Sequence, residues 1–97
     1  MAAITEIGTL IDRDPHIRGG LPKIAGTALT VSRIAVWYKS GLSAEEIALE
    51  YPHLTLAQVH AALAYYHANR DEVEAEIAHE AAAAAEWEQR LANQPHR

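Results

Sequence analysis

Apolar side chains return every three or four positions after residue 30, and this spacing predicts a first helix over residues 31–40. The positions on its inner face are Val31, Ile34, Ala35 and Tyr38. Thr30 precedes the run and is a favoured helix N-cap, whereas Gly41 stands where a left-handed residue commonly follows a helix. Both ends of this predicted helix are therefore marked in the sequence.

A capping box opens the next predicted helix. Ser43 and Glu46 have the spacing at which each side chain satisfies the other residue's free backbone N–H group. The helix that they open is expected to end near Glu50, because Pro52 cannot continue it. The result is a helix of about two turns.

A second capping box follows at Thr55 and Gln58 and predicts a longer helix, which runs to about Ala68. Four apolar residues recur at helical spacing along this segment, and we expect them to form its buried face. They are Leu56, Val59, Leu63 and Tyr66.

The segment after residue 68 is also predicted to be helical, through Leu91, because its alanine-rich stretch has high helix propensity. Asn69 and Glu72 have the form of a third capping box, so the chain either bends there or continues as one long helix. A narrow apolar stripe follows one face of this acidic helix: Val73, Ile77, Ala84, Trp87 and Leu91. A stripe that ends beside a tryptophan needs another surface to cover it.

Small turn-forming residues gather in the stretch GGLPKIAGTALTV, residues 19–31. Short apolar segments between these turns predict a small β arm. A glycine-rich loop beside a lysine can also cradle phosphate. A Walker loop, however, needs lysine and then serine or threonine at the start of a helix, whereas Lys23 stands in mid-loop. We therefore interpret the glycines as turn residues that serve the fold.

The formal net charge of −5 is divided unevenly along the chain. Residues 1–40 carry five basic and three acidic side chains, whereas residues 41–97 carry three basic and ten acidic ones. A basic half can approach phosphates, and an acidic half suits a basic protein surface. The chain has no cysteine and no apolar stretch near 18 residues, so we expect a soluble cytoplasmic protein.

Three histidines recur every seven residues, at His53, His60 and His67. On one helix the last two would lie about 10.5 Å apart along the axis, which is too far for one metal ion. The carboxylate pairs Asp12/Asp14 and Glu45/Glu46 fall in a turn and in a capping box, with no nucleophile to activate. We therefore expect no enzymatic activity, no metal site and no cofactor.

The two short helices joined by the residues YPHL have the construction of a helix-turn-helix, whose second helix enters the DNA major groove. An ordinary helical hairpin in a small bundle fits the pattern equally well. The positions expected to face outward carry no lysine or arginine: Gln58, Ala61, Ala62, Tyr65 and Asn69. Phosphate contacts would then come from the first 40 residues. The candidate DNA-binding residues are Arg33, Lys39, Thr55, Gln58 and Tyr65.

Two stretches, IDRDPHIRGGLPKIAGTALTV and GLSAEEIALEYPHLTLAQVHAALAYYHAN, closely resemble the bacterial family called Domain of Unknown Function 433. The resemblance covers about residues 10–70 and rests on the combined spacing of GGLPKIAGT and EEIALEYPHLT. It implies a helix-turn-helix of homeodomain-like type. The family commonly has arginine after Gly-Thr, where this chain has Ala28, and this departure favours a structural role for GGLPKIAGT.

The resemblance also implies the antitoxin of a type II toxin–antitoxin pair, whose usual neighbour is a PIN-like ribonuclease. Our hypothesis is a mainly α protein with a β arm and helix-turn-helix domain over residues 1–70 and an acidic helical tail over residues 71–97. It would neutralise a PIN-like nuclease and bind operator DNA as a dimer. The residues expected to contact the toxin or a second copy are Val73, Ile77, Trp87 and Leu91.

Two alternatives belong to other functional classes. The first is a helical module that self-associates or binds another protein without binding DNA. The second, a small hydrolase, lacks any nucleophile and base that the spacing could bring together. A PIN-like nuclease reading frame beside the gene would favour the antitoxin hypothesis over both.

Overall fold

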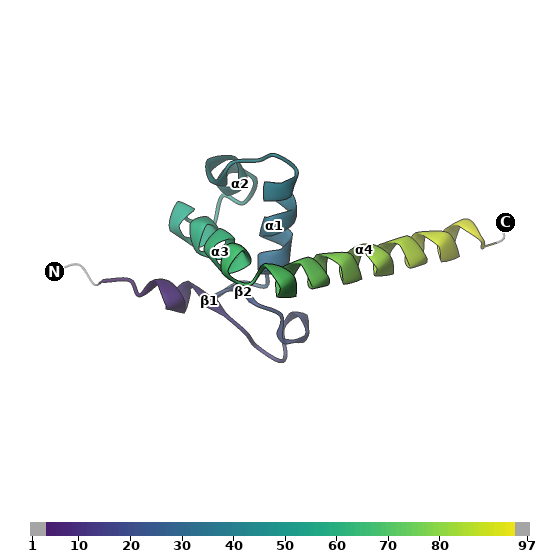
Figure 1. The fold of residues 1–97 in the computed structure, drawn as a ribbon, viewed down its shortest axis with the longest axis horizontal. Helices are drawn as coiled ribbons and strands as arrows, with labels where there is room; N and C mark the ends of the chain where they lie inside the picture. Colours follow the sequence, from purple (N-terminus) through teal and green to yellow (C-terminus); the bar gives the residue numbers. More distant parts are fainter. Residues whose placement is uncertain (1–3, 95–97) are drawn as a thin grey trace.

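The computed structural model describes residues 4–94, which form four α-helices and one two-stranded antiparallel sheet (Figure 1). The elements are a 3-10 turn over Ile7–Leu10, β1 (Ile11–Asp12), a 3-10 turn over Arg18–Gly20, β2 (Lys23–Ile24), α1 (Val31–Lys39), α2 (Ala44–Glu50), α3 (Leu56–Ala68) and α4 (Arg70–Ala92). The predicted mainly helical class and the small β arm, defined here as residues 7–30, are confirmed. No helix of residues 4–94 is long and apolar enough to span a membrane.

The ends of α1 lie where the sequence placed them. Thr30 is the N-cap, and its Oγ1 accepts a hydrogen bond from the Arg33 N–H at 3.3 Å. Gly41 adopts φ = 103° just after the helix, and its N–H donates to the Tyr38 carbonyl at 3.0 Å. Because this left-handed conformation strains residues that have a Cβ atom, glycine is the natural residue at this turn.

Both predicted capping boxes are confirmed. The Ser43 hydroxyl accepts from the Glu46 N–H, and the Glu46 carboxylate accepts from the Ser43 N–H, at 3.1 and 3.0 Å. Thr55 and Gln58 make the same reciprocal pair at 3.1 and 2.7 Å. These bonds satisfy N–H groups that an α-helix leaves free in its first turn, so they define where α2 and α3 begin.

The third capping box is absent, so this prediction was wrong. Asn69 has φ = −130° and ψ = 45°, which interrupts the helix and bends the chain between α3 and α4. Its side chain makes no cap and instead donates to the Tyr65 carbonyl at 3.1 Å. Glu72 is drawn away from the cap because it binds Tyr65 and Arg13. Of the two alternatives left open, the chain therefore bends.

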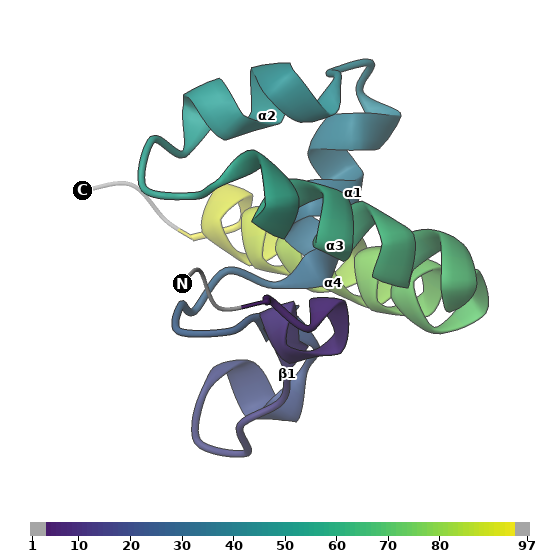
Figure 2. The same cartoon turned by 90° about the vertical axis from the view of Figure 1, so that its left-hand side faces the viewer.

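The hydrophobic core lies where α1 packs against α2, α3 and the start of α4. Figure 2 shows α2 and the β arm on opposite sides of α3, and both contact it. The buried side chains come from all four helices, from β2 and from the α2–α3 loop: Ile24, Val31, Ile34, Ala35, Ala44, Ile47, Leu54, Val59, Ala62, Leu63, Tyr66 and Val73. Burying each of these isoleucine or valine side chains stabilises the folded state by about 1.5–3 kcal/mol relative to leaving it exposed.

The buried face of α3 is wider than predicted. Ala61 and Ala62 were expected to face outward, but both are buried. Because the arm, α1, α2 and α4 all contact α3, its neighbours surround more than one stripe of the helix. Leu56, expected in the core, is exposed at the first position of the helix.

The β arm places Lys23 in a strand and not in a phosphate loop. β1 and β2 pair in antiparallel register, with Ile11 opposite Ile24 and Asp12 opposite Lys23. The Lys23 side chain is only 3% exposed, and its ammonium lies 2.7 Å from the Asp12 carboxylate. A buried charge is tolerated when it is paired in this way. Lys23 therefore joins the two strands of the arm.

We expect Gly26→Val to lower the melting temperature. Gly26 has φ = +79°, a conformation that costs residues with a Cβ atom about 1–2 kcal/mol. For a domain of this size each kcal/mol corresponds to roughly 4–8 °C. No heavy atom lies within 4 Å of a Cβ built on Gly26, so the backbone conformation alone causes the loss. Thermal unfolding by circular dichroism tests this, with Gly8→Val, in equally open space without a positive φ, as the control.

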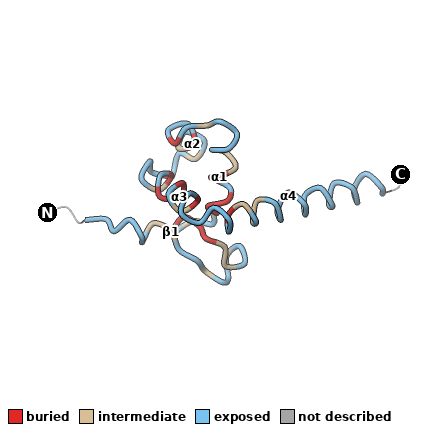
Figure 3. Tube along the Cα trace, in the orientation of Figure 1, coloured by how far each residue is buried: buried red, intermediate tan, exposed pale blue. Residues whose placement is uncertain are grey.

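The second half of α4 leaves the domain. Figure 3 shows that burial is confined to the beginning of this helix and that its far end is surrounded by solvent. From Ala78 to Gln94 every residue is exposed. This projection makes the molecule elongated, with extents of 64 × 28 × 27 Å. We call residues 81–92 the distal α4 segment.

Candidate protein-binding and nucleic-acid-binding surfaces

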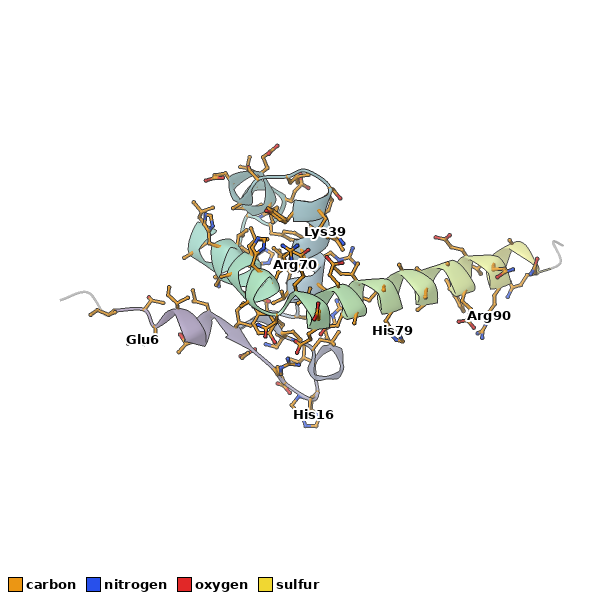
Figure 4. The ribbon with its side chains drawn as sticks, in the orientation of Figure 1. Glu6, His16, Lys39, Arg70, His79 and Arg90 are labelled. Carbon is orange, nitrogen blue, oxygen red and sulfur yellow. The ribbon has the colours of Figure 1, made fainter. Side chains whose placement is uncertain are left out.

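The base of α4 is held to α1 by Glu74. Its carboxylate accepts from the Lys39 ammonium at 2.6 Å and from the Tyr66 hydroxyl at 2.5 Å. The hydrogen bond from Lys39, followed by that from Tyr66, lowers the pKa of Glu74 below its ordinary value. Lys39, predicted to contact DNA phosphate, thus has a carboxylate partner within the chain. Figure 4 shows Lys39 and Arg70 close to the junction of α1 and α4.

A second set of contacts holds the same helix to the β arm. Arg13 Nη2 donates to the Tyr65 hydroxyl and to Glu72 Oε1, both at 2.7 Å, and the Tyr65 hydroxyl donates to Glu72 Oε1 at 2.7 Å. The hydrogen bond from Tyr65, aided by Arg13, lowers the pKa of Glu72. Burial raises the pKa of Tyr65. Tyr65, another predicted DNA contact, therefore positions α4 against the arm.

Glu76 lies one helical turn after Glu72 on α4, but its carboxylate has a different environment from the hydrogen-bonded carboxylate of Glu72. The Oε2 atom of Glu76 is buried and has no hydrogen-bond partner among the described residues. Burial, together with the negative charge of Glu72, raises the pKa of Glu76. The ionised form of Glu76 therefore weakens the native state, whereas the ionised form of Glu72 strengthens it.

We expect two matched substitutions on α4 to shift stability in opposite directions. At pH 7, Glu76→Gln should raise the melting temperature and Glu72→Gln should lower it. The Glu72 contribution is present above its ordinary pKa of 4.5 and is lost as the pH falls through its lower folded-state pKa. The Glu76 penalty is complete above its raised folded-state pKa and disappears below 4.5. Melting curves from pH 3 to 8 should therefore converge at low pH, and effects of equal sign would contradict this account.

The residues predicted to contact the toxin or a second copy do not share one exposed surface. Val73 is completely buried in the core, so its assignment to an intermolecular contact was wrong. The reason is that the first turn of α4 packs on α1, which takes this end of the stripe into the domain. Ile77 is half-buried against the core. Trp87 and Leu91 lie on the distal α4 segment and are 58% and 46% exposed.

The surface of α2 and α3 is poor in positive charge. Residues 40–69 contain no lysine or arginine, and Glu45, Glu46 and Glu50 give this stretch a negative charge. The side chains of Thr55 and Gln58 are occupied in the α3 capping box. The exposed face of α3 carries apolar, threonine and histidine side chains: Thr55, Leu56, Ala57, His60, Ala64, His67 and Ala68. Such a face offers no cation to a phosphate.

The three histidines of the sevenfold pattern are exposed. His67 lies edge-on to the Tyr38 ring, 5.4 Å between centroids, and its Nδ1 is 3.0 Å from an Arg70 guanidinium nitrogen. No group of three histidine or carboxylate side chains that could hold a metal ion occurs within residues 4–94. His67 therefore contributes to an aromatic contact between α1 and α3.

Arg33, the remaining predicted DNA contact, is exposed and lines a cleft that the sequence analysis did not foresee. We call it the arm–α1 cleft; it has a volume of about 370 Å³ and is lined by Arg18, Leu21, Ala28, Leu29, Thr30, Arg33 and Glu80. Arg18 Nε donates to the Ala28 carbonyl at 3.2 Å, and Glu80 accepts from Ser32 Oγ at 3.0 Å. The cleft is thus formed by segments far apart in the sequence.

Comparison with known proteins gives a family and a solved relative. The family model described as "Protein of unknown function (DUF433)" matches residues 11–66. A crystal structure of a DUF433 member protein from Anabaena variabilis ATCC 29413 superimposes with a TM-score of 0.67 and 30% sequence identity. The match covers 72% of this chain and 69% of that one. No curated protein matches the sequence.

Proposed function

The chain belongs to the DUF433 family, whose function is unknown, and we propose that it is an antitoxin, as the family resemblance implies, and that it neutralises a PIN-like nuclease through the distal α4 segment. The single observation that carries the proposal is the projection of Trp87 and Leu91 away from the domain on the distal α4 segment, which no other described residue covers. Exposed tryptophan at helical spacing from leucine is typical of a helix that binds in a groove.

The charge of α4 supports a basic partner. Seven acidic and two basic side chains lie between Arg70 and Ala92. A nuclease that binds RNA presents positive charge to its substrate, and an acidic helix is complementary to such a surface. Glu86 and Glu88 flank Trp87 on the distal α4 segment, where they would speed the encounter.

Operator binding as a dimer is the second part of the proposal. Arg33 is exposed and supports it, whereas the absence of lysine and arginine from residues 40–69 does not. This same absence favours the alternative function, a module that self-associates or binds protein without binding DNA. Salt-dependent binding to the DNA upstream of its own gene separates the two, because a protein-only module would bind no duplex at low ionic strength.

The proposal is tested by co-expression with a PIN-like nuclease encoded next to the gene. The full chain should restore growth, and a chain that ends after Ala82 should not. This end point retains Val73, Ile77 and Glu80 and so keeps every α4 contact with the domain that is described above. Circular dichroism shows whether the shortened chain is folded. Protection by a folded shortened chain would show that the distal α4 segment is not the neutralising element.

A further inference from the structure

Two guanidinium groups line the arm–α1 cleft, and neither has an acidic partner. Ion pairs among the described residues engage the other cations of the domain and of α4: Arg13, Lys23, Lys39 and Arg90. Arg70 lies over the Tyr66 ring. Arg18 and Arg33 form no ion pair within residues 4–94, and both are exposed. The two arginines of the β arm and α1 that form no ion pair therefore line one cleft, together with a single carboxylate, Glu80.

The backbone at Arg18 is strained. Its φ of 50° lies in the left-handed region, which residues with a Cβ atom rarely adopt, and the following Gly19 and Gly20 have φ of 64° and 80°. Residues held in such a conformation cluster at functional sites. The Arg18 side chain lines the cleft, and its Nε donates to the carbonyl of Ala28, another lining residue. Its two terminal nitrogens make no hydrogen bond to described residues and can take a ligand.

The cleft also opens at the start of α1. Thr30, its N-cap, and Arg33, in its first turn, both line the cleft. The N-terminal end of a helix carries partial positive charge, which adds to that of the two guanidinium groups. Arginine is the side chain best suited to bind phosphate, because its planar fork donates two parallel hydrogen bonds.

We propose that the arm–α1 cleft is an oxyanion site that takes a phosphate group, supplied by the backbone of a nucleic acid and held between Arg18 and Arg33. This inference rests on the operator-binding part of the proposed function, and it assigns the phosphate contact to Arg33 together with Arg18 of the β arm. Glu80 also lines the cleft, and its negative charge opposes the anion, so it limits the affinity.

Fluorescence anisotropy with a labelled DNA duplex measures the contribution of each residue. Arg18→Ala and Arg33→Ala should each weaken binding about tenfold. Each should also reduce the slope of log affinity against log salt by about one. Glu80→Gln should tighten binding by about two- to fivefold. Arg90→Ala removes the same charge from the distal α4 segment and should change neither quantity.

A second variant separates binding from folding at Arg18. Arg18→Gly relieves the left-handed strain, so the melting temperature should stay within about 3 °C of the parent value while binding still falls about tenfold. A large loss of thermal stability together with unchanged duplex binding by the folded protein would show that Arg18 serves the fold, and would overturn the assignment.

Titration with inorganic phosphate, followed by backbone amide NMR shifts, identifies the source of the anion. Shifts centred on Arg18 and Arg33 with no duplex binding would keep the oxyanion site, filled by free phosphate, and would end the operator-binding proposal. If Arg18→Ala, Arg33→Ala and Glu80→Gln all leave the duplex affinity unchanged, the inference is overturned and operator binding belongs to another surface. Weaker duplex binding by Glu80→Gln would overturn it too. If neither probe binds, both proposals fail.

Discussion

Replacing Trp87 with alanine should lower the affinity for the proposed nuclease partner by at least about thirtyfold, because truncating an interface tryptophan typically costs about 2 kcal/mol or more. The indole is 58% exposed in the free chain, so a partner would remove a large apolar area from water. The substitution should not affect folding, since Trp87 lies beyond the part of α4 that packs on the domain. Isothermal titration with purified nuclease measures the loss.

A matched control uses another exposed apolar residue. Leu49 lies on α2 and is 79% exposed, so Leu49→Ala should leave the nuclease affinity unchanged. The stripe has a competing use in the predicted homodimer, which sedimentation detects. If Trp87→Ala turned a dimer into a monomer while nuclease inhibition stayed intact, Trp87 would belong to the dimer and not to the toxin interface.

The second large effect is on folding: Val73→Asp should leave the chain unfolded at 25 °C. Val73 is fully buried in the core, and a carboxylate there would have to be desolvated or protonated. That penalty is several kcal/mol and adds to the lost packing, against a total stability of about 5–15 kcal/mol for a domain. Far-ultraviolet circular dichroism and thermal unfolding measure the result.

Leu91→Asp is the control, because it makes a comparable apolar-to-acidic change on the same stripe of the same helix. Leu91 is 46% exposed and touches no part of the core, so its substitution should leave the melting temperature almost unchanged. A stable Val73→Asp variant would mean that α4 is not part of the folded domain. The two variants thus distinguish the end of the stripe that packs in the core, at Val73, from the end that is exposed, at Leu91.

Local signals predicted the helices well. Thr30, Ser43 and Thr55 each stand before a helix that they cap, the period of apolar residues predicted α1 and α3, and the helix propensity of the alanine-rich stretch predicted α4. These signals act within a few residues, so they are readable without knowledge of the tertiary structure. The bend at Asn69 could not be predicted from local signals alone, because the conformation there depends on Tyr65 and on partners of Glu72 that lie elsewhere in the chain.

The surfaces were harder to predict because they depend on contacts between distant segments. Arg13 meets Glu72 across 59 positions, and Ser32 meets Glu80 across 48. Nothing in the local sequence indicates that Lys39 finds a carboxylate on α4.

Because the chain bends at Asn69, α4 begins inside the domain and projects from it, so the orientation of the whole helix is set at its base. With a rise of about 1.5 Å per residue, Leu91 lies roughly 27 Å beyond Val73. A rotation of about 10° at the base would therefore carry Leu91 through roughly 5 Å, the width of a side chain. The carboxylates of Glu72, Glu74 and Glu80, which bind the arm and α1, set this angle. Small changes at these three anchors would thus become large displacements at the tip, so the domain would determine where the helix meets the proposed partner.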